Sequence, residues 1–260
     1  MKKIVTVFAI LFATSLPAFA QMSGAEIMKK SDEMASSDNE QSVLVMRLIN
    51  SKGKERSRNI KQFIRFDEND NRSSLIRFNA PADVAGTGFL AVENADREDD
   101  QYLYLPALQR SRRISASNET DNFMGSDFTF EDLDREDLSD FNYKLEGEEQ
   151  INGAAAWKII ATPANDKKAK ESGYSKREIF VSKQSFIPLM INYYDKKGTL
   201  TKVFTAKDVK EVGAGKYRAH KMEIANKATG HTTVLEFSDF VINGGLEEDF
   251  FTVRYLEKTN

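Results

Sequence analysis

The residue types that most often carry chemistry are sparse in this chain. It has only two histidines, His220 and His231, and no cysteine. If the turn from Asn226 to Gly230 closes a hairpin, Asn226 pairs with His231, and His220 lies roughly 20 Å away along its strand at ~3.3 Å per residue. The two imidazoles then cannot share a metal ion.

No known catalytic or metal-binding pattern is complete in the sequence. Asp67-x-Asn69-x-Asn71 begins like a calcium loop, but Arg72 occupies the glycine position and Phe78 the position of the final carboxylate. We interpret it as a polar turn. Nucleophile-elbow, Walker and dinucleotide-binding patterns are absent. We predict no enzyme activity, no cofactor and no metal site. An unusual hydrolase that uses one of the two histidines stays open as a remote alternative.

One segment, Glu119 to Asp140, combines charge with large apolar side chains. It has nine acidic residues and one basic residue. Its large apolar residues are Phe123, Met124, Phe128, Phe130, Leu133 and Leu138. Because burial of each such side chain contributes ~1.5–3 kcal/mol, we expect the segment to dock its aromatic groups into a sheet. Gly125 allows a sharp turn, and residues 128–138 are expected to form a short helix with Asp127 as its N-cap.

Just before this segment lies a cluster of arginines. Arg110 and Arg112 share one face of an expected strand, and Arg113 points to the other. Two interpretations stay open. The pair forms surface ion pairs with the acidic segment, which add little stability, or it binds an anionic headgroup at the mouth of a cavity. Whether the arginines hold the segment's carboxylates or a headgroup, we expect Phe123, Met124, Phe128 and Phe130 to form a movable cover over the cavity.

Most of the remaining chain is predicted to form strands. Alternation is clear near the C-terminus, where Leu235, Phe237 and Val241 share a face and Glu236 points away. The expected strands cover residues 43–50, 56–66, 73–78, 89–93, 101–105, 109–114, 141–148, 155–162, 176–182, 189–194, 200–208, 217–226 and 231–242. Many strands joined by short turns predict a largely antiparallel sheet that must curl or close. A capping box at Ser23-x-x-Glu26 predicts a helix to about residue 35.

The first residues indicate export. Two lysines precede the apolar run from Ile4 to Leu16, and Ala18-Phe19-Ala20 is typical of a cleavage site. We expect a cleaved signal peptide at residues 1–20 and a single domain at residues 21–260; a retained membrane anchor is the alternative. Loss of the two lysines changes the formal net charge from −3 to −5, which argues against a general nucleic-acid binder.

Three ordered sequence blocks carry a family resemblance. They are FNAPADVAGTGFL, DDQYLYLPALQRSRRI and FMGSDFTFEDL, and the C-terminal GGLEEDFFTVRYL agrees with them. The chain resembles the exported outer-membrane lipoprotein-sorting family, and more narrowly the LolA-like subfamily that often accompanies exporters of the RND class. This resemblance implies a half-open antiparallel barrel with helices over its concave side, in which acyl chains are sheltered. It supplies no catalytic residue.

From this resemblance we expect a periplasmic carrier or binding protein for a lipid or lipidated molecule, acting in transfer toward the outer membrane. An acyl chain of about sixteen carbons costs ~13 kcal/mol to expose to water, at ~0.8 kcal/mol per methylene, so it needs a dry cavity. The candidate lining residues are Phe63, Phe78, Leu90, Tyr102, Tyr104 and Trp157.

The expected partners are acyl chains, an RND-type exporter of the inner membrane and an acceptor at the outer membrane, with no nucleic acid. A second function stays open. The same fold with a filled core would serve as a non-enzymatic accessory protein that docks on the exporter through charged loops.

Overall fold

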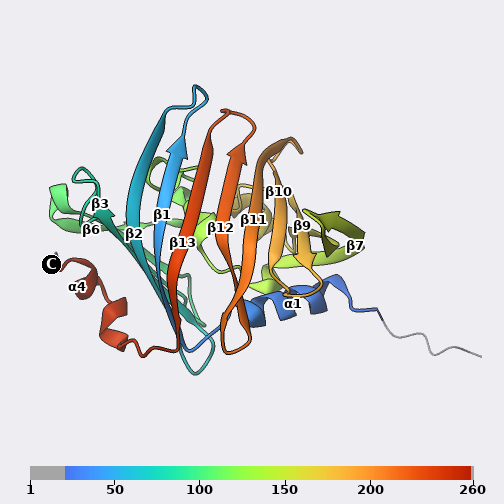
Figure 1. Cartoon of the computed structure of the whole chain (residues 1–260), viewed down its shortest axis with the longest axis horizontal. Coiled ribbons are helices and arrows are strands. Elements are labelled where there is room, and N and C mark those ends of the chain that lie inside the picture. Colours follow the sequence, from blue (N-terminus) through green and yellow to red (C-terminus); the bar gives the residue numbers. More distant parts are fainter. Residues whose placement is uncertain (1–20, 259–260) are drawn as a thin grey trace, which may run out of the picture.

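One antiparallel sheet organises the computed structural model, which describes residues 21–258 (Figure 1). The strands are β1 (Asn39–Ile49), β2 (Glu55–Phe66), β3 (Arg72–Ala80), β4 (Gly88–Val92), β5 (Asp100–Leu105), β6 (Arg110–Ile114), β7 (Phe141–Ile151), β8 (Ala154–Pro163), β9 (Lys176–Ser182), β10 (Pro188–Tyr194), β11 (Leu200–Gly213), β12 (Lys216–Asn226) and β13 (Thr232–Ile242). The expected signal peptide lies outside the described residues.

Helices are short and few. The α-helices are α1 (Gly24–Ala35), α2 (Phe130–Leu133), α3 (Asp166–Glu171) and α4 (Val253–Leu256). Five 3₁₀ turns complete the described structure, namely η1 (Pro106–Leu108), η2 (Ala116–Asn118), η3 (Phe123–Gly125), η4 (Leu138–Asp140) and η5 (Glu248–Phe251). None of the helices in residues 21–258 has the length and apolar character needed to span a bilayer.

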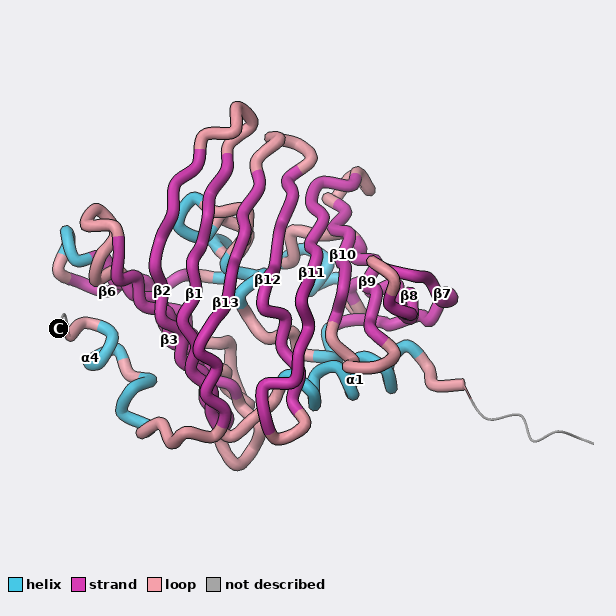
Figure 2. The backbone as a smooth tube through the Cα atoms, viewed as in Figure 1, coloured by secondary structure: helices cyan, strands magenta, loops and turns pink. Residues whose placement is uncertain are grey.

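The strand order places the middle of the sequence at the two edges of the sheet. From edge to edge the order is β6-β5-β4-β3-β2-β1-β13-β12-β11-β10-β9-β8-β7. Along the chain, β1 to β6 run from the centre of the sheet to one edge. Strands β7 to β13 then run from the other edge back to the centre, where β13 pairs with β1. The sheet curls without closing (Figure 2). This confirms the predicted mainly β fold with a half-open antiparallel barrel.

The connection from β6 to β7 must pass from one edge of the sheet to the other. Residues 115–140, here called the crossing segment, make this connection over the concave face, behind the central strands in Figure 1.

The expected helix over residues 128–138 is wrong in its extent. Only α2 forms, and its N-cap is Thr129, whose hydroxyl accepts a hydrogen bond from the Asp132 N–H at 3.2 Å. Asp127 does not cap the helix because its carboxylate is bound by Thr233.

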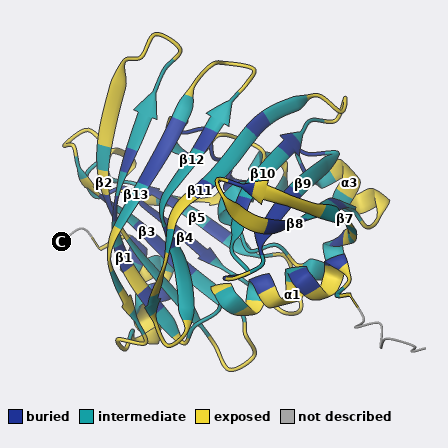
Figure 3. Cartoon of the chain, turned by 45° about the vertical axis from the view of Figure 1, so that its right-hand side comes forward, coloured by how far each residue is buried: buried dark blue, intermediate teal, exposed yellow. Residues whose placement is uncertain are grey.

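The aromatic side chains of the crossing segment are buried against the sheet, as predicted. Phe123 is fully buried, and its ring lies 5.3 Å from that of Phe89 and 5.9 Å from that of Phe78. Phe130 meets Phe123 edge to face at 5.6 Å. Figure 3 shows the dark blue of buried residues along this part of the sheet. The aromatic groups of one loop thus complete the interior of the N-terminal half.

The two ends of the described chain cover opposite parts of the sheet. Helix α1 begins at the predicted capping box of Ser23 and Glu26, and its Ile27 is fully buried against β8 and β9. The C-terminal η5 and α4 lie on the outer face, where Phe251 and Leu256 pack on β3, β4 and β5. Strand β4 is therefore buried on both faces and lacks alternation.

Two predicted turns are also confirmed. The carboxylate of Asp67 accepts hydrogen bonds from the backbone N–H groups of Asn69 and Asn71 at 2.8 and 2.9 Å, as in a polar turn. The backbone N–H of Asn226 donates to the carbonyl of His231 at 2.9 Å, which closes the expected β12–β13 hairpin.

We predict that Phe123→Ala lowers the free energy of unfolding by ~3–5 kcal/mol, because it removes a fully buried ring at the centre of an aromatic cluster. The urea midpoint measures this loss. Leu108→Ala is the control, since Leu108 is 57% exposed and its truncation should change stability by less than about 0.5 kcal/mol. Equal midpoints for the two variants would contradict the packing described here.

Candidate functional site

The concave side of the sheet forms a partly open cavity of about 420 Å³ between α1, the crossing segment and strands β1–β3 and β10–β13. Its size falls in the range of about 300–1,000 Å³ that is typical of small-molecule sites. Aliphatic and aromatic groups make up most of the wall. They are Ala35, Ile64, Phe66, Phe128, Leu133, Ile187, Pro188, Ile191, Tyr193, Phe204, Ala206, Ala219, Met222, Leu235, Phe237 and Phe240. The cavity can therefore accept an apolar group.

Charged residues of the cavity wall occur as paired groups. Arg218 and Glu40 form a largely buried ion pair with a closest distance of 2.7 Å. The guanidinium of Arg72 donates to the carbonyl of Leu133 at 3.2 Å. Burial lowers the pKa of Arg72, and the carboxylate of Asp134 opposes this shift. A ligand in the cavity thus meets apolar groups and charges that already have partners.

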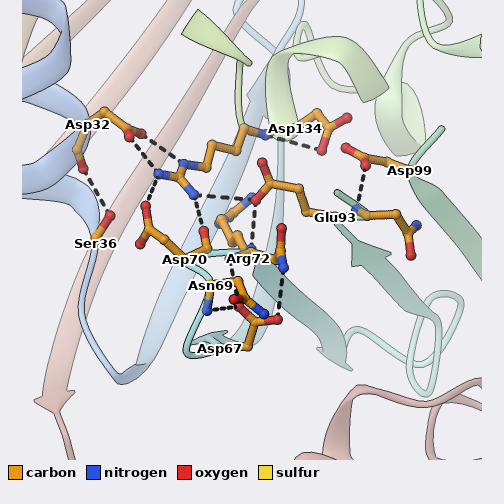
Figure 4. Close-up of polar contacts among 12 residues, drawn as sticks. Asp32, Ser36, Asp67, Asn69, Asp70, Arg72, Glu93, Asp99 and Asp134 are labelled. Carbon is orange, nitrogen blue, oxygen red and sulfur yellow. Dashed lines mark hydrogen bonds and ion pairs between the residues drawn. The ribbon is translucent and has the colours of Figure 1, made fainter. Parts of the chain in front are cut away.

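Arg135 joins three separate parts of the molecule at one side of the cavity. Its guanidinium lies 2.5 Å from the carboxylate of Asp32 in α1, 2.6 Å from that of Asp70 in the β2–β3 turn and 3.4 Å from that of Glu93 after β4. Figure 4 labels these three carboxylates and marks their contacts with dashed lines. Hydrogen bonding to Asp32 raises the pKa of Arg135 above its ordinary value. This Arg135 network fastens the crossing segment to α1.

A second fastening lies deeper, where Lys202 of β11 meets Asp132 of the crossing segment. Their charged atoms are 2.5 Å apart, and the two side chains are only 8% and 2% exposed. Asp132 also accepts a hydrogen bond from the Tyr174 hydroxyl at 2.8 Å. The crossing segment is thus held to the C-terminal half of the sheet by a buried, hydrogen-bonded ion pair.

The structure places the six predicted lining residues on two faces of the sheet. Phe63, Leu90, Tyr102 and Tyr104 lie on the outer face, where they pack with the C-terminal η5 and α4. Phe78 lies on the concave face beneath Phe123, and Trp157 packs under α1 beside Phe186. None of the six is among the residues that line the 420 Å³ cavity. Contact of these side chains with a ligand stays a prediction.

The four residues of the predicted cover belong to the crossing segment and are packed. Phe123, Phe128 and Phe130 are buried, and Met124 packs against the same cluster. Of the four, only Phe128 reaches the 420 Å³ cavity. Their role as a movable cover stays a prediction.

The arginines of β6 lie apart from the crossing segment's carboxylates. Arg110 and Arg112 are exposed, and in residues 21–258 neither forms an ion pair with the acidic segment. Arg113 pairs instead with Asp100 at 3.1 Å. The interpretation of Arg110 and Arg112 as surface partners of the acidic segment is therefore wrong, because the bases that pair with it come from β9, β11 and α3. A headgroup role for the two arginines stays a prediction.

Comparison with known proteins gives the family. A family model described as an uncharacterized protein matches residues 70–258. A proposed outer membrane lipoprotein-sorting protein domain from Vibrio parahaemolyticus is 32% identical, with a TM-score of 0.84 over 90% of this chain and 98% of that chain. The chain belongs to the family of outer membrane lipoprotein-sorting protein domains, and its half-open sheet is the LolA-like fold.

Two further structures resemble this LolA-like protein. A DUF1329 family protein from Desulfovibrio piger is 31% identical, with a TM-score of 0.83 over 90% of this chain and 97% of that chain. A LolA superfamily protein from Nitrosomonas europaea is 19% identical, with a TM-score of 0.70 over 90% of this chain and all of that chain, and it shares the fold. No curated protein matches the chain.

Several residues of the cavity region were missed by sequence reasoning. Arg135 is the single base in an acidic stretch, a signal that could have marked it as the centre of a network. Lys202 carries no such signal. The ring of His220 meets that of Phe240 edge to face at 5.1 Å, and His231 lies in the β12–β13 turn. In residues 21–258, no three acidic or histidine side chains are grouped so that they could hold a metal ion.

Carboxylates gather where the crossing segment passes β5. Burial raises the pKa of Glu119 to about 7, and the charge of Asp134 adds to this. Burial also raises the pKa of Asp99 to about 6. A carboxyl whose pKa is raised in the folded state binds more protons folded than unfolded. Its contribution to stability is therefore lost as the pH rises from about 4 to about 7.

Replacing Glu119 tests this cluster. We expect Glu119→Gln to melt at a higher temperature than the wild type at pH 8, where the wild-type carboxyl must be charged, and at nearly the same temperature at pH 4. Glu68→Gln, in the exposed β2–β3 turn, removes one negative charge elsewhere and is the control. If the melting temperatures of Glu119→Gln and the wild type differ by the same amount at pH 4 and pH 8, the raised pKa of Glu119 is contradicted.

Replacing Lys202 tests the buried pair. Lys202→Met should lower the free energy of unfolding by ~3–5 kcal/mol, because it leaves the Asp132 carboxylate buried without its cation. Adding Asp132→Asn, which removes that charge, should restore part of the loss. The urea midpoints of the single and double variants measure both effects, and a double variant no more stable than Lys202→Met would contradict the assignment.

Proposed function

We propose that this LolA-like protein shelters the acyl chain of a lipid or lipidated molecule in its 420 Å³ cavity and carries it through the periplasm toward the outer membrane. The observation that carries the proposal is the apolar wall of that cavity, which lies at the concave side of an unclosed sheet. The lipoprotein-sorting relative at 32% identity supports the class of cargo.

The energetics favour such a site. Each methylene taken out of water contributes ~0.8 kcal/mol. The burial of a chain that fills the cavity therefore offsets the entropy that ligand and protein lose when they become ordered on binding. Phe204, Met222, Leu235 and Phe237 come from three adjacent strands and form a continuous apolar surface. The paired charges of Glu40 and Arg218 leave no isolated charge against the chain.

The cavity is partly open to solvent, and separation of α1 from the crossing segment would widen its opening. Asp32 of α1 and Arg135 of the crossing segment are held together at its side by a 2.5 Å ion pair that keeps partial contact with solvent. In the proposal this pair opens during loading and closes afterwards.

The crossing segment also favours a second candidate function. Phe123 and Phe130 fill the concave side of the N-terminal half of the sheet, so part of the interior is already occupied by the protein's own side chains. A protein with this fold that binds no lipid would act as an accessory protein of an RND-type exporter. Lipid analysis by mass spectrometry of protein purified from its own host separates the two, because the carrier retains a stoichiometric lipid and the accessory protein is free of it.

We predict that Met222→Trp weakens fatty-acid binding at least tenfold, because the larger side chain occupies the cavity. Isothermal titration calorimetry with hexadecanoate measures it. The matched control is Met190→Trp, because Met190 is also partly buried but packs in a different cluster, away from the cavity. Wild type and control should gain about 2.7 kcal/mol of stability at a ligand concentration 100 times Kd.

If hexadecanoate neither binds the wild type nor raises its melting temperature, the carrier proposal is wrong. Equal weakening by Met222→Trp and Met190→Trp would place the ligand elsewhere.

A further inference from the structure

A second, smaller pocket lies where two neighbouring hairpins meet the crossing segment. Its volume is about 210 Å³, and it opens between the β1–β2 and β12–β13 hairpins, which project side by side at the top of Figure 1. Its wall consists of Leu48, Ile49, Asn50, Lys54, Arg56, Gly125, Asp127, His231 and Thr233. Nothing in the carrier proposal uses this pocket.

Three basic side chains line the pocket. Arg56 lies opposite Leu48 in the β1–β2 register and therefore shares its concave face, while Lys54 and His231 lie in the two hairpin turns. Within residues 21–258, neither Lys54 nor Arg56 has a carboxylate within ion-pair distance. The neighbouring Glu55 is engaged elsewhere, 3.7 Å from Arg47. The pocket thus holds positive charge without a partner in a protein whose net charge is negative.

Hydrogen bonds fix the frame of the pocket. The side-chain carbonyl of Asn50 accepts from the backbone N–H groups of Lys52 and Lys54 at 3.0 and 2.9 Å, which sets the turn that carries Lys54. Gly125 adopts a positive φ of 72°, and a side chain there would meet open space. The wall of the crossing segment is therefore bare at this point.

The one carboxylate of the pocket wall is already bound. The two oxygens of Asp127 accept hydrogen bonds from the Thr233 hydroxyl at 2.9 Å and the Asn226 amide at 3.2 Å, and the residue is 5% exposed. The cations Lys54 and Arg56 therefore remain available to an anion from outside.

This pocket and the apolar cavity lie on either side of the same piece of chain. Asp127 lines the pocket, and the next residue, Phe128, lines the cavity. On β13, Thr233 lines the pocket, and Leu235, the next residue on the same face of the strand, lines the cavity. A polar group in the pocket and an apolar chain in the cavity would thus be neighbours.

We propose that the pocket formed by Lys54, Arg56 and His231 binds a phosphate group, and that the group belongs to the headgroup of a phosphorylated lipid whose acyl chain enters the cavity. The planar guanidinium and the ammonium provide donors that match tetrahedral phosphate oxygens. The lipid part of the proposal rests on the proposed carrier function, whereas phosphate binding does not.

The test compares two short-chain lipids that differ only in the phosphate, dihexanoyl phosphatidic acid and dihexanoylglycerol, with inorganic phosphate as a third probe. Calorimetric titration at pH 7 gives Kd for the wild type and for Lys54→Gln/Arg56→Gln. The control is Lys196→Gln/Lys197→Gln, which removes the same charge from the exposed β10–β11 hairpin. Melting temperatures verify that both variants fold.

We expect the wild type to bind phosphatidic acid at least about tenfold more tightly than dihexanoylglycerol, from one or more charge-assisted hydrogen bonds. Lys54→Gln/Arg56→Gln should lose this preference and keep its affinity for dihexanoylglycerol, and the control should keep both. Raising the ionic strength from 0.05 to 0.5 M should reduce the preference, since the pocket is open to solvent.

The other outcomes are decisive as well. If phosphate confers no preference, or if the control loses it equally, the pocket proposal is overturned while binding of dihexanoylglycerol still supports a carrier. If inorganic phosphate binds in a manner that depends on Lys54 and Arg56 and neither lipid binds, the pocket takes free phosphate and the carrier proposal fails.

Discussion

The passage of the chain between the two edges of the sheet is the constraint on which the rest of this structure depends. Because β6 and β7 lie at opposite edges, the crossing segment traverses the concave face, where residues 126–130 are buried. Buried polar groups are stable only with partners, so each part of the segment must find one. Phe123 and Phe130 fill the concave side of the N-terminal half, and the space beside them, lined by residues of β1–β3 and β10–β13, forms the cavity.

The partners of the crossing segment come from almost every part of the sheet. Asp127 is bound by β12 and β13, Asp132 by β11, and Asp134 by Gln101 of β5 at 3.1 Å. Arg135 adds a partner from α1, the carboxylate of Asp32. Asp127 and Phe128, adjacent in this segment, belong to the walls of two different pockets.

Local patterns predicted the strands, the hairpin turns, the capping box and the burial of the loop aromatics, because each depends on neighbours in sequence. Such local patterns could not show which residues point to the concave face of the sheet and which to the outer face. Leu90 is buried against the C-terminal segment and Phe89 against Phe123. Because both are large and apolar, their alternation does not show which of the two points to the concave face. Arg135 and Asp32 are 103 residues apart, and no local pattern joins them. Phe240 reaches the cavity beside a bulge at Asp239, whose φ is 52°, and this shifts the register that simple alternation assumes.

The pairing of β1 with β13 has a consequence for how the molecule forms. Arg47 and Glu236, which pair across this central ladder, are 189 residues apart in the chain. The middle of the sheet is therefore assembled from strands near the two ends of the described chain, and it cannot close before nearly all of the polypeptide is available. Such distant pairings are slow to form, and until then β1 presents an unpaired edge. Completion of the sheet must therefore follow synthesis of the chain rather than accompany it.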